Sequence, residues 1–147
     1  MTCIAFDGVT LAADKRACYG TTITTVTKIR RIGDLLVGGA GESSFIGAML
    51  DWIEKGRDPA TLPKTQADKD DWQPVLVIEA DGTTSLYERT AHPIRHEQQH
   101  IAIGSGREYA MAAMYLGCTA KDAVAVAIAL DSTCGNGIDT LEYRGTA

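Results

Sequence analysis

Three Asp-Gly or Gly-Asp pairs, each placed between two apolar or alternating runs, constrain the fold of this chain more than any other feature. Such pairs favour the tight turns that join antiparallel strands, because both residue types tolerate the left-handed backbone that these turns need. Asp7-Gly8 separates TCIAF from VTLAA, Gly33-Asp34 separates TKIRRI from LLVGGA, and Asp81-Gly82 separates PVLVIEA from TTSLYE. The sequence therefore predicts three β-hairpins.

Other strands carry weaker turn signals. HPIRH and HIAIG are expected to pair through a turn at 97–99, a threonine-rich strand piece lies at 19–27, and IDTLEYR is expected to form the last strand. Residues 56–72 are polar and contain two prolines, which predicts a surface loop.

Three helices are expected between these strand groups. Apolar residues in 43–56 recur at i, i+4, i+7 and i+8, the period of an amphipathic helix. Ser105 and Glu108 have the spacing of a capping box before a helix that ends at Gly117. A third helix, starting after Thr119, is apolar on almost every side, so we expect it to be buried. The order of elements indicates antiparallel sheets with helices on their outer faces, a layered α+β domain.

Length and charge narrow the classes of function. A chain of 147 residues fits one domain, 1–147, and its net charge of -5 disfavours nucleic acid or an anionic membrane as a partner. The sequence contains no apolar run long enough to span a bilayer and no secretory signal pattern. We expect a soluble, cytoplasmic protein.

Cysteine and histidine give little support for a metal site. The four cysteines lack any C-x-x-C spacing, which fits reduced thiols. His92, His96 and His100 recur every fourth position and would align on a helix as metal ligands, but Pro93 disfavours a helix there. A solvated strand or loop is the preferred interpretation, and no metal is expected.

Two glycine-rich turns, VGGAGES and AIGSGRE, follow predicted strands. Neither matches a dinucleotide fingerprint or a phosphate-binding loop, and their glycines can equally serve close packing of strand ends on helix starts. Both turns nevertheless place backbone N–H groups at a helix N-terminus, where such groups can stabilise a transient anion.

The candidate nucleophile is Thr2. The usual serine motifs are absent, whereas removal of Met1 would place a free α-amine beside the Thr2 hydroxyl, a nucleophile with a built-in base. Lys28 could favour the alkoxide, and Asp14 could hold the lysine by a charge-assisted hydrogen bond. Each of the three can equally be an ordinary strand residue.

The chain resembles the N-terminal-nucleophile hydrolases, specifically proteasome β subunits and the bacterial HslV peptidase. Five segments carry the resemblance in the correct order: MTCIAFDGVTLAAD, TKIRRI, VGGAGESSF, IAIGSGREYA and DSTCGNGID. The resemblance implies a four-layer αββα sandwich with two antiparallel sheets flanked by helices.

The resemblance also implies roles for individual residues. Thr2 would be the nucleophile, its own α-amine the base acting through a water, Lys28 the stabiliser of the hydroxyl's ionised form and Asp14 the partner of that lysine. The backbone N–H of Gly41 would form the oxyanion hole. Two further groups follow by the same comparison, a network around the α-amine at Ser105, Asp131 and Cys134, and a substrate pocket at Val26, Gly39 and Ser43.

The expected function is that of a threonine-type endopeptidase that degrades unfolded polypeptides inside a homo-oligomeric ring or stack of rings. A ring-shaped ATPase partner is expected from the resemblance, no cofactor is required, and the loop Asp131–Gly137 could bind a monovalent cation. Two alternatives stay open: an amidohydrolase for a small amide on the same fold, and a non-catalytic shell subunit that retains Met1.

Overall fold

The first sheet holds the N-terminal strand in its interior. A computed structural model describes residues 1–65, 68 and 70–145. Four strands form this sheet in the order β10 (Ile101–Ile103), β1 (Ile4–Phe6), β2 (Thr10–Asp14) and β11 (Ile138–Glu142), all antiparallel. Because β1 bonds to neighbours on both sides, the residues just before it are held in a fixed position.

The second sheet has five antiparallel strands. Their order is β5 (Ile29–Ile32), β6 (Leu35–Gly39), β7 (Val75–Ile78), β8 (Thr84–Tyr87) and β9 (Ile94–His96). The chain meanders through this sheet from one edge to the other, and only the β6–β7 connection is long enough to include a helix.

The three predicted hairpins are confirmed as β1–β2, β5–β6 and β7–β8. The predicted pairing of HPIRH with HIAIG is wrong, because β9 pairs with β8 whereas β10 pairs with β1 in the other sheet. Burial explains the separation. Ile94 is 51% exposed on an edge strand, while all three residues of β10 are buried.

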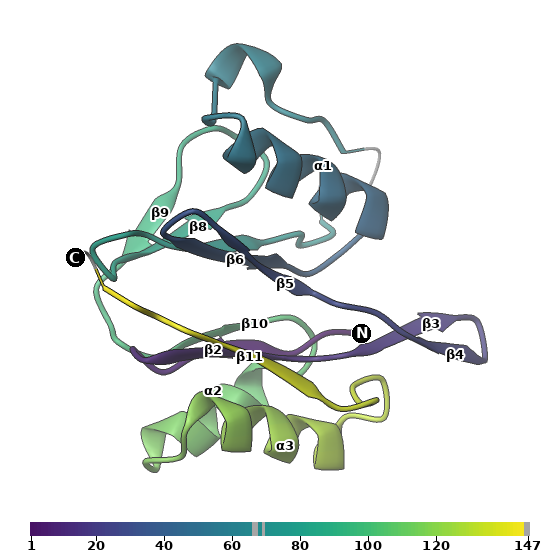
Figure 1. The fold of residues 1–147 in the computed structure, drawn as a ribbon. Coiled ribbons are helices and arrows are strands. Elements are labelled where there is room, and N and C mark those ends of the chain that lie inside the picture. Colours follow the sequence, from purple (N-terminus) through teal and green to yellow (C-terminus); the bar gives the residue numbers. More distant parts are fainter. Residues whose placement is uncertain (66–67, 69, 146–147) are drawn as a thin grey trace.

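The three predicted helices are present, and the combination of antiparallel sheets with helices is confirmed. Figure 1 shows α1 (Ser43–Glu54) over the outer face of the five-stranded sheet, with α2 (Arg107–Tyr115) and α3 (Ala120–Leu130) below the four-stranded sheet. A short 3₁₀ turn, η1 (Pro59–Thr61), lies in the predicted loop. No helix of the described residues is long and apolar enough to cross a membrane.

Apolar residues form three clusters that hold these layers together. Large side chains fill the space between the sheets, among them Ile4, Phe6, Leu36, Leu76 and Ile103. A second cluster joins α1 to the five-stranded sheet. The third, between the four-stranded sheet and α2 and α3, consists mainly of alanines and cysteines, so the helices approach that sheet closely.

The prediction that the third helix is buried between other elements is wrong for one of its faces. Ala120, Ala123, Val124 and Ala127 of α3 are buried, but Leu130 is 61% exposed. Only one face of α3 packs on the sheet and on α2. Because alanine is small and mildly apolar, the composition of this segment did not distinguish its two faces.

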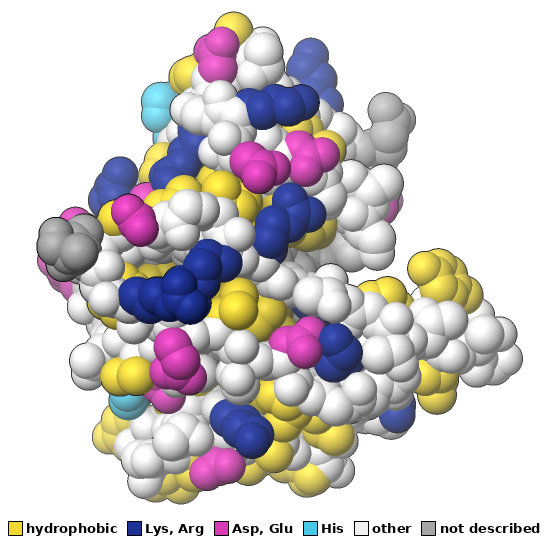
Figure 2. Space-filling view, viewed as in Figure 1, with side chains coloured by type: hydrophobic (Ala, Val, Ile, Leu, Met, Phe, Trp, Pro, Cys, Tyr) yellow, Lys and Arg dark blue, Asp and Glu magenta, His cyan; other side chains and the backbone are white. Residues whose placement is uncertain are grey.

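The threonine-rich segment is a projecting hairpin. It comprises β3 (Arg16–Tyr19) and β4 (Thr22–Thr25), and it extends beyond the body of the molecule in Figure 1. Tyr19 is 66% and Ile23 51% exposed, and Figure 2 shows hydrophobic side chains at the end of this projection. The base of β3 contributes to the site described next.

Candidate active site

Thr2 lies two residues before β1, against the turn that follows β10. The backbone N–H of Gly106 donates to the Thr2 carbonyl oxygen at 3.1 Å. Gly104, with a φ of +95°, passes so close that a Cβ there would clash with that same carbonyl. The glycines of the GSG turn are therefore needed to seat Thr2, which agrees with the close-packing alternative considered for this turn.

Lys28 lies within hydrogen-bond distance of the Thr2 side chain. Its Nζ atom is 3.3 Å from Thr2 Oγ1, 2.9 Å from Asp14 Oδ1 and 2.7 Å from the carbonyl oxygen of Met1. The lysine side chain is 9% exposed and that of Asp14 is fully buried. The structure thus brings together Thr2 from just before β1, Lys28 from the position before β5 and Asp14 from the end of β2.

Asp14 is fixed by four donors. Its Oδ1 accepts from Lys28 Nζ and the Cys3 N–H, both at 2.9 Å, and its Oδ2 accepts from the backbone N–H groups of Arg16 and Gly135, both at 3.1 Å. Both oxygens of this buried carboxylate are therefore occupied by donors, one of them from a charged side chain. Asp14 thus holds the Lys28 side chain in place facing Thr2.

Ser105 connects Thr2 to the loop that follows α3. The backbone N–H of Thr2 donates to Ser105 Oγ at 3.2 Å, and Ser105 Oγ donates to Asp131 Oδ2 at 2.7 Å. The predicted capping box is wrong, since Gly106 is the residue that caps α2 and no side chain bonds the cap. The Ser105 side chain points instead toward Thr2 and Asp131.

Asp131 and Cys134 differ in ionisation. Burial alone raises the pKa of the Asp131 carboxyl, but hydrogen bonds from Thr133 and Ser105 outweigh it and hold the pKa well below its ordinary value. Burial, reinforced by the charges of Asp14 and Asp131, raises the pKa of Cys134 to about 11. Cys134 is therefore a neutral thiol at pH 7, and its Sγ lies 3.5 Å from Asp131 Oδ2 as a weak donor.

A cavity of about 480 Å³ opens beside Thr2. Its lining includes Gly41, the predicted oxyanion-hole residue, together with Thr2, Lys28 and Ser105. Gly41 follows β6 with a φ of +137°, and a Cβ there would lie 2.7 Å from the Gln73 side chain, so the turn requires glycine.

The residues predicted for the substrate pocket do not line this cavity. Gly39 is buried, and a Cβ there would lie 2.7 Å from Ile46, on the side of α1. Ser43 is the exposed first residue of α1, and Val26 bonds through its N–H to the carbonyl of Lys15. Besides Thr2, Lys28, Gly41 and Ser105, the lining consists of Met1, Arg16, Ala17, Cys18, Ala40, Trp72, Pro74, Gly104 and Arg107.

The sequence contained a usable signal for two of these lining residues. Arg107 directly follows the GSG turn and Arg16 follows Asp14 by two positions, so both lie next to motifs that were already singled out. Trp72 lies in the loop 56–72, where no periodic pattern marks a function. Its position in the site is set by the path of that loop in three dimensions.

The three histidines do not converge. His96 lies in β9, whereas His92 and His100 lie in loops on either side of it. Within the described residues, no group of three or more histidine, cysteine, aspartate or glutamate side chains is placed to hold a metal ion.

Comparison by sequence gives no relative: no protein-family model and no curated protein matches the chain. Comparison by structure covers nearly all of it. BPH from Thiobacillus denitrificans, in complex with epoxomicin, superimposes with a TM-score of 0.73 at 18% identity, over 97% of this chain and 97% of that one. Eukaryotic HslV from Trypanosoma brucei gives a TM-score of 0.72 at 21% identity, over 97% of this chain and 98% of that one. The resemblance to the proteasome and HslV group is thus confirmed in the fold.

Proposed function

On this proteasome- and HslV-like fold, we propose that the chain is a threonine-type endopeptidase whose nucleophile is Thr2. One observation carries the proposal, the 3.3 Å contact between Thr2 Oγ1 and an Nζ atom that is itself paired with buried Asp14. A cation held by a buried carboxylate beside a hydroxyl favours ionisation of that hydroxyl. The cavity beside Thr2 provides space for a substrate.

The proposed reaction has two steps. Thr2 Oγ1 attacks the peptide carbonyl carbon while its proton passes through a water to the α-amine and then to the leaving amine. The C–N bond breaks and an ester to Thr2 remains. A water, deprotonated by the same α-amine, then adds to the ester carbonyl, the bond between that carbon and Thr2 Oγ1 breaks, and the proton passes from the amine to Oγ1 as the new carboxyl end is released.

Neighbouring groups support these steps. The N–H of Gly41 would stabilise the oxyanion of each tetrahedral intermediate, because Gly41 and Thr2 line the same cavity. Ser105 would orient the α-amine, since its Oγ already lies 3.2 Å from Thr2 N. Asp131 would fix Ser105, and the neutral thiol of Cys134 would complete the network.

The α-amine becomes available only when the Met1–Thr2 bond is cut. The carbonyl oxygen of that bond accepts from Lys28 Nζ at 2.7 Å, so the residue that would assist Thr2 is engaged by Met1 while Met1 is present. We propose that cutting this bond releases Lys28 and supplies the base in one event. The shell-subunit alternative requires the opposite, an intact Met1.

We further propose that the single domain 1–147, an αββα sandwich, assembles into a cytoplasmic homo-oligomeric ring or stack of rings that admits unfolded polypeptide. Exposed apolar side chains on α2, α3 and their connection support an interface, with Tyr115 at 87%, Leu116 at 83% and Leu130 at 61% exposed. A ring ATPase partner and a monovalent cation at Asp131–Gly137 remain parts of this proposal.

The direct test compares wild type, Thr2→Ala and Thr140→Ala. Thr140 is an exposed threonine of β11 and serves as the matched control. With Met1 removal verified by intact mass, wild type and Thr140→Ala should cleave fluorogenic peptides and denatured casein, while Thr2→Ala should lose cleavage by about 10³-fold or more. Light scattering should show the same assembly for all three proteins.

Each alternative predicts a different result. Wild-type turnover by Thr2→Ala would contradict the mechanism. An exposed Thr2 amine without cleavage of peptide or casein would favour the small-amide hydrolase. Retention of Met1 on protein made in cells with methionine aminopeptidase would favour the shell subunit.

A further inference from the structure

The cavity beside Thr2 is lined by three cationic side chains and by no carboxylate. The cations are Arg16, Lys28 and Arg107. Lys28 is neutralised by Asp14, and the proposed mechanism already uses it. The two arginines have no role in that mechanism, and both line the space that a substrate would occupy.

Both arginines are held by neutral groups. Arg16 donates from Nε to Asn136 Oδ1 at 3.0 Å and from Nη1 to the Ser132 carbonyl at 2.7 Å. Arg107 donates from Nη1 to the Gly104 carbonyl at 3.0 Å, and its guanidinium lies 5.0 Å from the centre of the Trp72 ring. No ion pair joins either arginine to a carboxylate of the described residues.

Arg107 is the better placed of the two to bind a ligand. The Nη2 atom of Arg16 is packed against Gly135, where an added Cβ would lie 2.6 Å from it, so this arginine is largely committed to the 132–136 loop. Among the described residues, Arg107 donates a side-chain hydrogen bond through Nη1 alone, and the Trp72 ring lies against its guanidinium. Its anchor, Gly104, is the residue in contact with Thr2.

A guanidinium that lines a cavity and has N–H groups available prefers a carboxylate as its ligand, because it can bind the two oxygens through two parallel hydrogen bonds. Two such charges also repel a lysine or arginine brought into the same cavity. A purely apolar side chain would leave both charges without compensation. The lining therefore matches an acidic ligand group better than a neutral or basic one.

We propose that this cavity selects an aspartate or glutamate side chain beside the bond that is cleaved, with Arg107 as its main partner and Trp72 as the support of Arg107. The proposal rests on the peptidase function proposed above. It rests on residues other than Val26, Gly39 and Ser43, at which the resemblance placed the substrate pocket.

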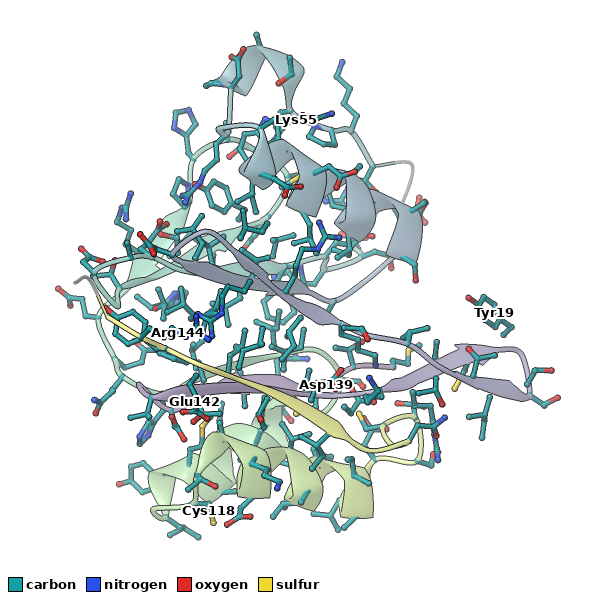
Figure 3. The ribbon with its side chains drawn as sticks, in the orientation of Figure 1. Tyr19, Lys55, Cys118, Asp139, Glu142 and Arg144 are labelled. Carbon is teal, nitrogen blue, oxygen red and sulfur yellow. The ribbon has the colours of Figure 1, made fainter. Side chains whose placement is uncertain are left out.

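The test uses C-terminally blocked fluorogenic peptides that differ only in the residue before the scissile bond, which is Glu, Gln or Lys. For wild type, kcat/KM should be about tenfold higher for Glu than for Gln, and lower again for Lys. Arg107→Gln should reduce the Glu-to-Gln ratio to about one, whereas Arg107→Lys should keep part of it. Arg144→Gln is the matched control. Arg144 is exposed, and it lies at the opposite end of the molecule from Tyr19 of β3, the strand that contributes to the cavity lining (Figure 3).

A second measurement covers variants that lose turnover or fold poorly. Calorimetry with Thr2→Ala protein should show about tenfold tighter binding of the acetylated Glu peptide amide than of its Gln counterpart. A peptide that binds only when its own C-terminal carboxylate is free would overturn the side-chain assignment.

The outcomes separate the two proposals. Cleavage of all three peptides at equal rates, or an unchanged Glu-to-Gln ratio in Arg107→Gln, would overturn the acidic preference and leave the peptidase proposal standing. Absence of any cleavage with Thr2 exposed would contradict the peptidase, and the calorimetric ratio would then decide on the cavity.

Discussion

Two ion pairs, the buried Lys28–Asp14 pair and the partly buried Arg57–Glu79 pair, differ in how many of their hydrogen-bonding groups are already used. Arg57 contacts both oxygens of Glu79, at 2.8 and 2.9 Å, and bonds the Tyr87 hydroxyl at 3.0 Å. Lys28 touches one oxygen of Asp14 and directs its other donors at Thr2 Oγ1 and the Met1 carbonyl. We call the Arg57–Glu79 pair closed, because the donors named here are used within the pair and on Tyr87. We call the Lys28–Asp14 pair open, because Lys28 also contacts the hydroxyl of Thr2, the proposed nucleophile.

The location of each pair matches this difference. Arg57 follows α1 and has a φ of +62°, and it joins the end of that helix to strands β7 and β8. Tyr87 also meets the Trp52 ring edge-on, at 5.5 Å between centroids. A closed bidentate pair is suited to fastening one layer to another, whereas a single contact from a lysine leaves donors available for chemistry. Three substitutions test this distinction.

Lys28→Ala should have the largest effect on function. The loss of the cation beside Thr2 Oγ1 should lower kcat/KM by about 10²–10³-fold or more. Folding should persist, because Asp14 keeps its three backbone donors, the N–H groups of Cys3, Arg16 and Gly135. Lys15→Ala, which removes a partly exposed lysine paired with Asp139, is the control and should retain activity. Equal loss in both variants would show that the open pair has no special role.

Asp14→Asn should reduce both activity and stability. If the NH₂ group of the asparagine takes the place of Asp14 Oδ2, the backbone N–H groups of Arg16 and Gly135 lose their acceptor and are left unsatisfied. The free energy of unfolding should fall by about 2–4 kcal/mol. Asp139→Asn, at a pair on the surface, should change it by under about 1 kcal/mol. Denaturant unfolding measures both, and a stable but inactive Asp14→Asn would limit Asp14 to positioning Lys28.

Glu79→Gln should affect stability alone, by about 1–3 kcal/mol at pH 7. Burial by itself raises the pKa of Glu79, but hydrogen bonds from Arg57 and Ser85 outweigh it and hold the pKa below its ordinary value. A carboxyl whose pKa is lowered by folding stabilises the folded protein at every pH above its ordinary pKa. This contribution is lost as the pH falls through the pKa that the carboxyl has in the folded protein.

Thermal unfolding checks the pH dependence of this pair. The difference in Tm between wild type and Glu79→Gln should be largest near pH 7 and shrink below pH 4.5. Peptide cleavage at pH 7 should be unchanged. A loss of cleavage in folded Glu79→Gln would show that the closed pair also serves the active site.

Local signals explain what could be predicted from the sequence. A turn such as Asp7-Gly8 determines its own hairpin, so β1–β2 follows from adjacent residues. The pairing of β10 depends instead on burial beside β1, almost a hundred residues away in sequence. Short strands with similar flanking residues give no local evidence of which sheet they join, and so the β9–β10 pairing was wrong.

The site shows the same division. Thr2, Lys28 and Asp14 could be proposed from chemistry and resemblance, and the structure brings them together. Ser105 has the correct spacing for a helix cap, yet long-range partners at Thr2 and Asp131 take its hydroxyl. Trp72 and Arg107 meet only because a loop and a helix start converge, which no spacing in the sequence records.

The interior position of β1 has a further consequence for how such a protein would fail. Thr2 is two residues from a strand that is bonded on both sides, by β10 and β2, and no flexible tether separates the hydroxyl from the sheet. Local opening of hydrogen bonds at an edge of the sheet would leave Thr2, the proposed nucleophile, in place beside Lys28. Heat inactivation should therefore coincide with melting of the whole four-stranded sheet, so that catalytic lifetime at high temperature reports directly on global unfolding.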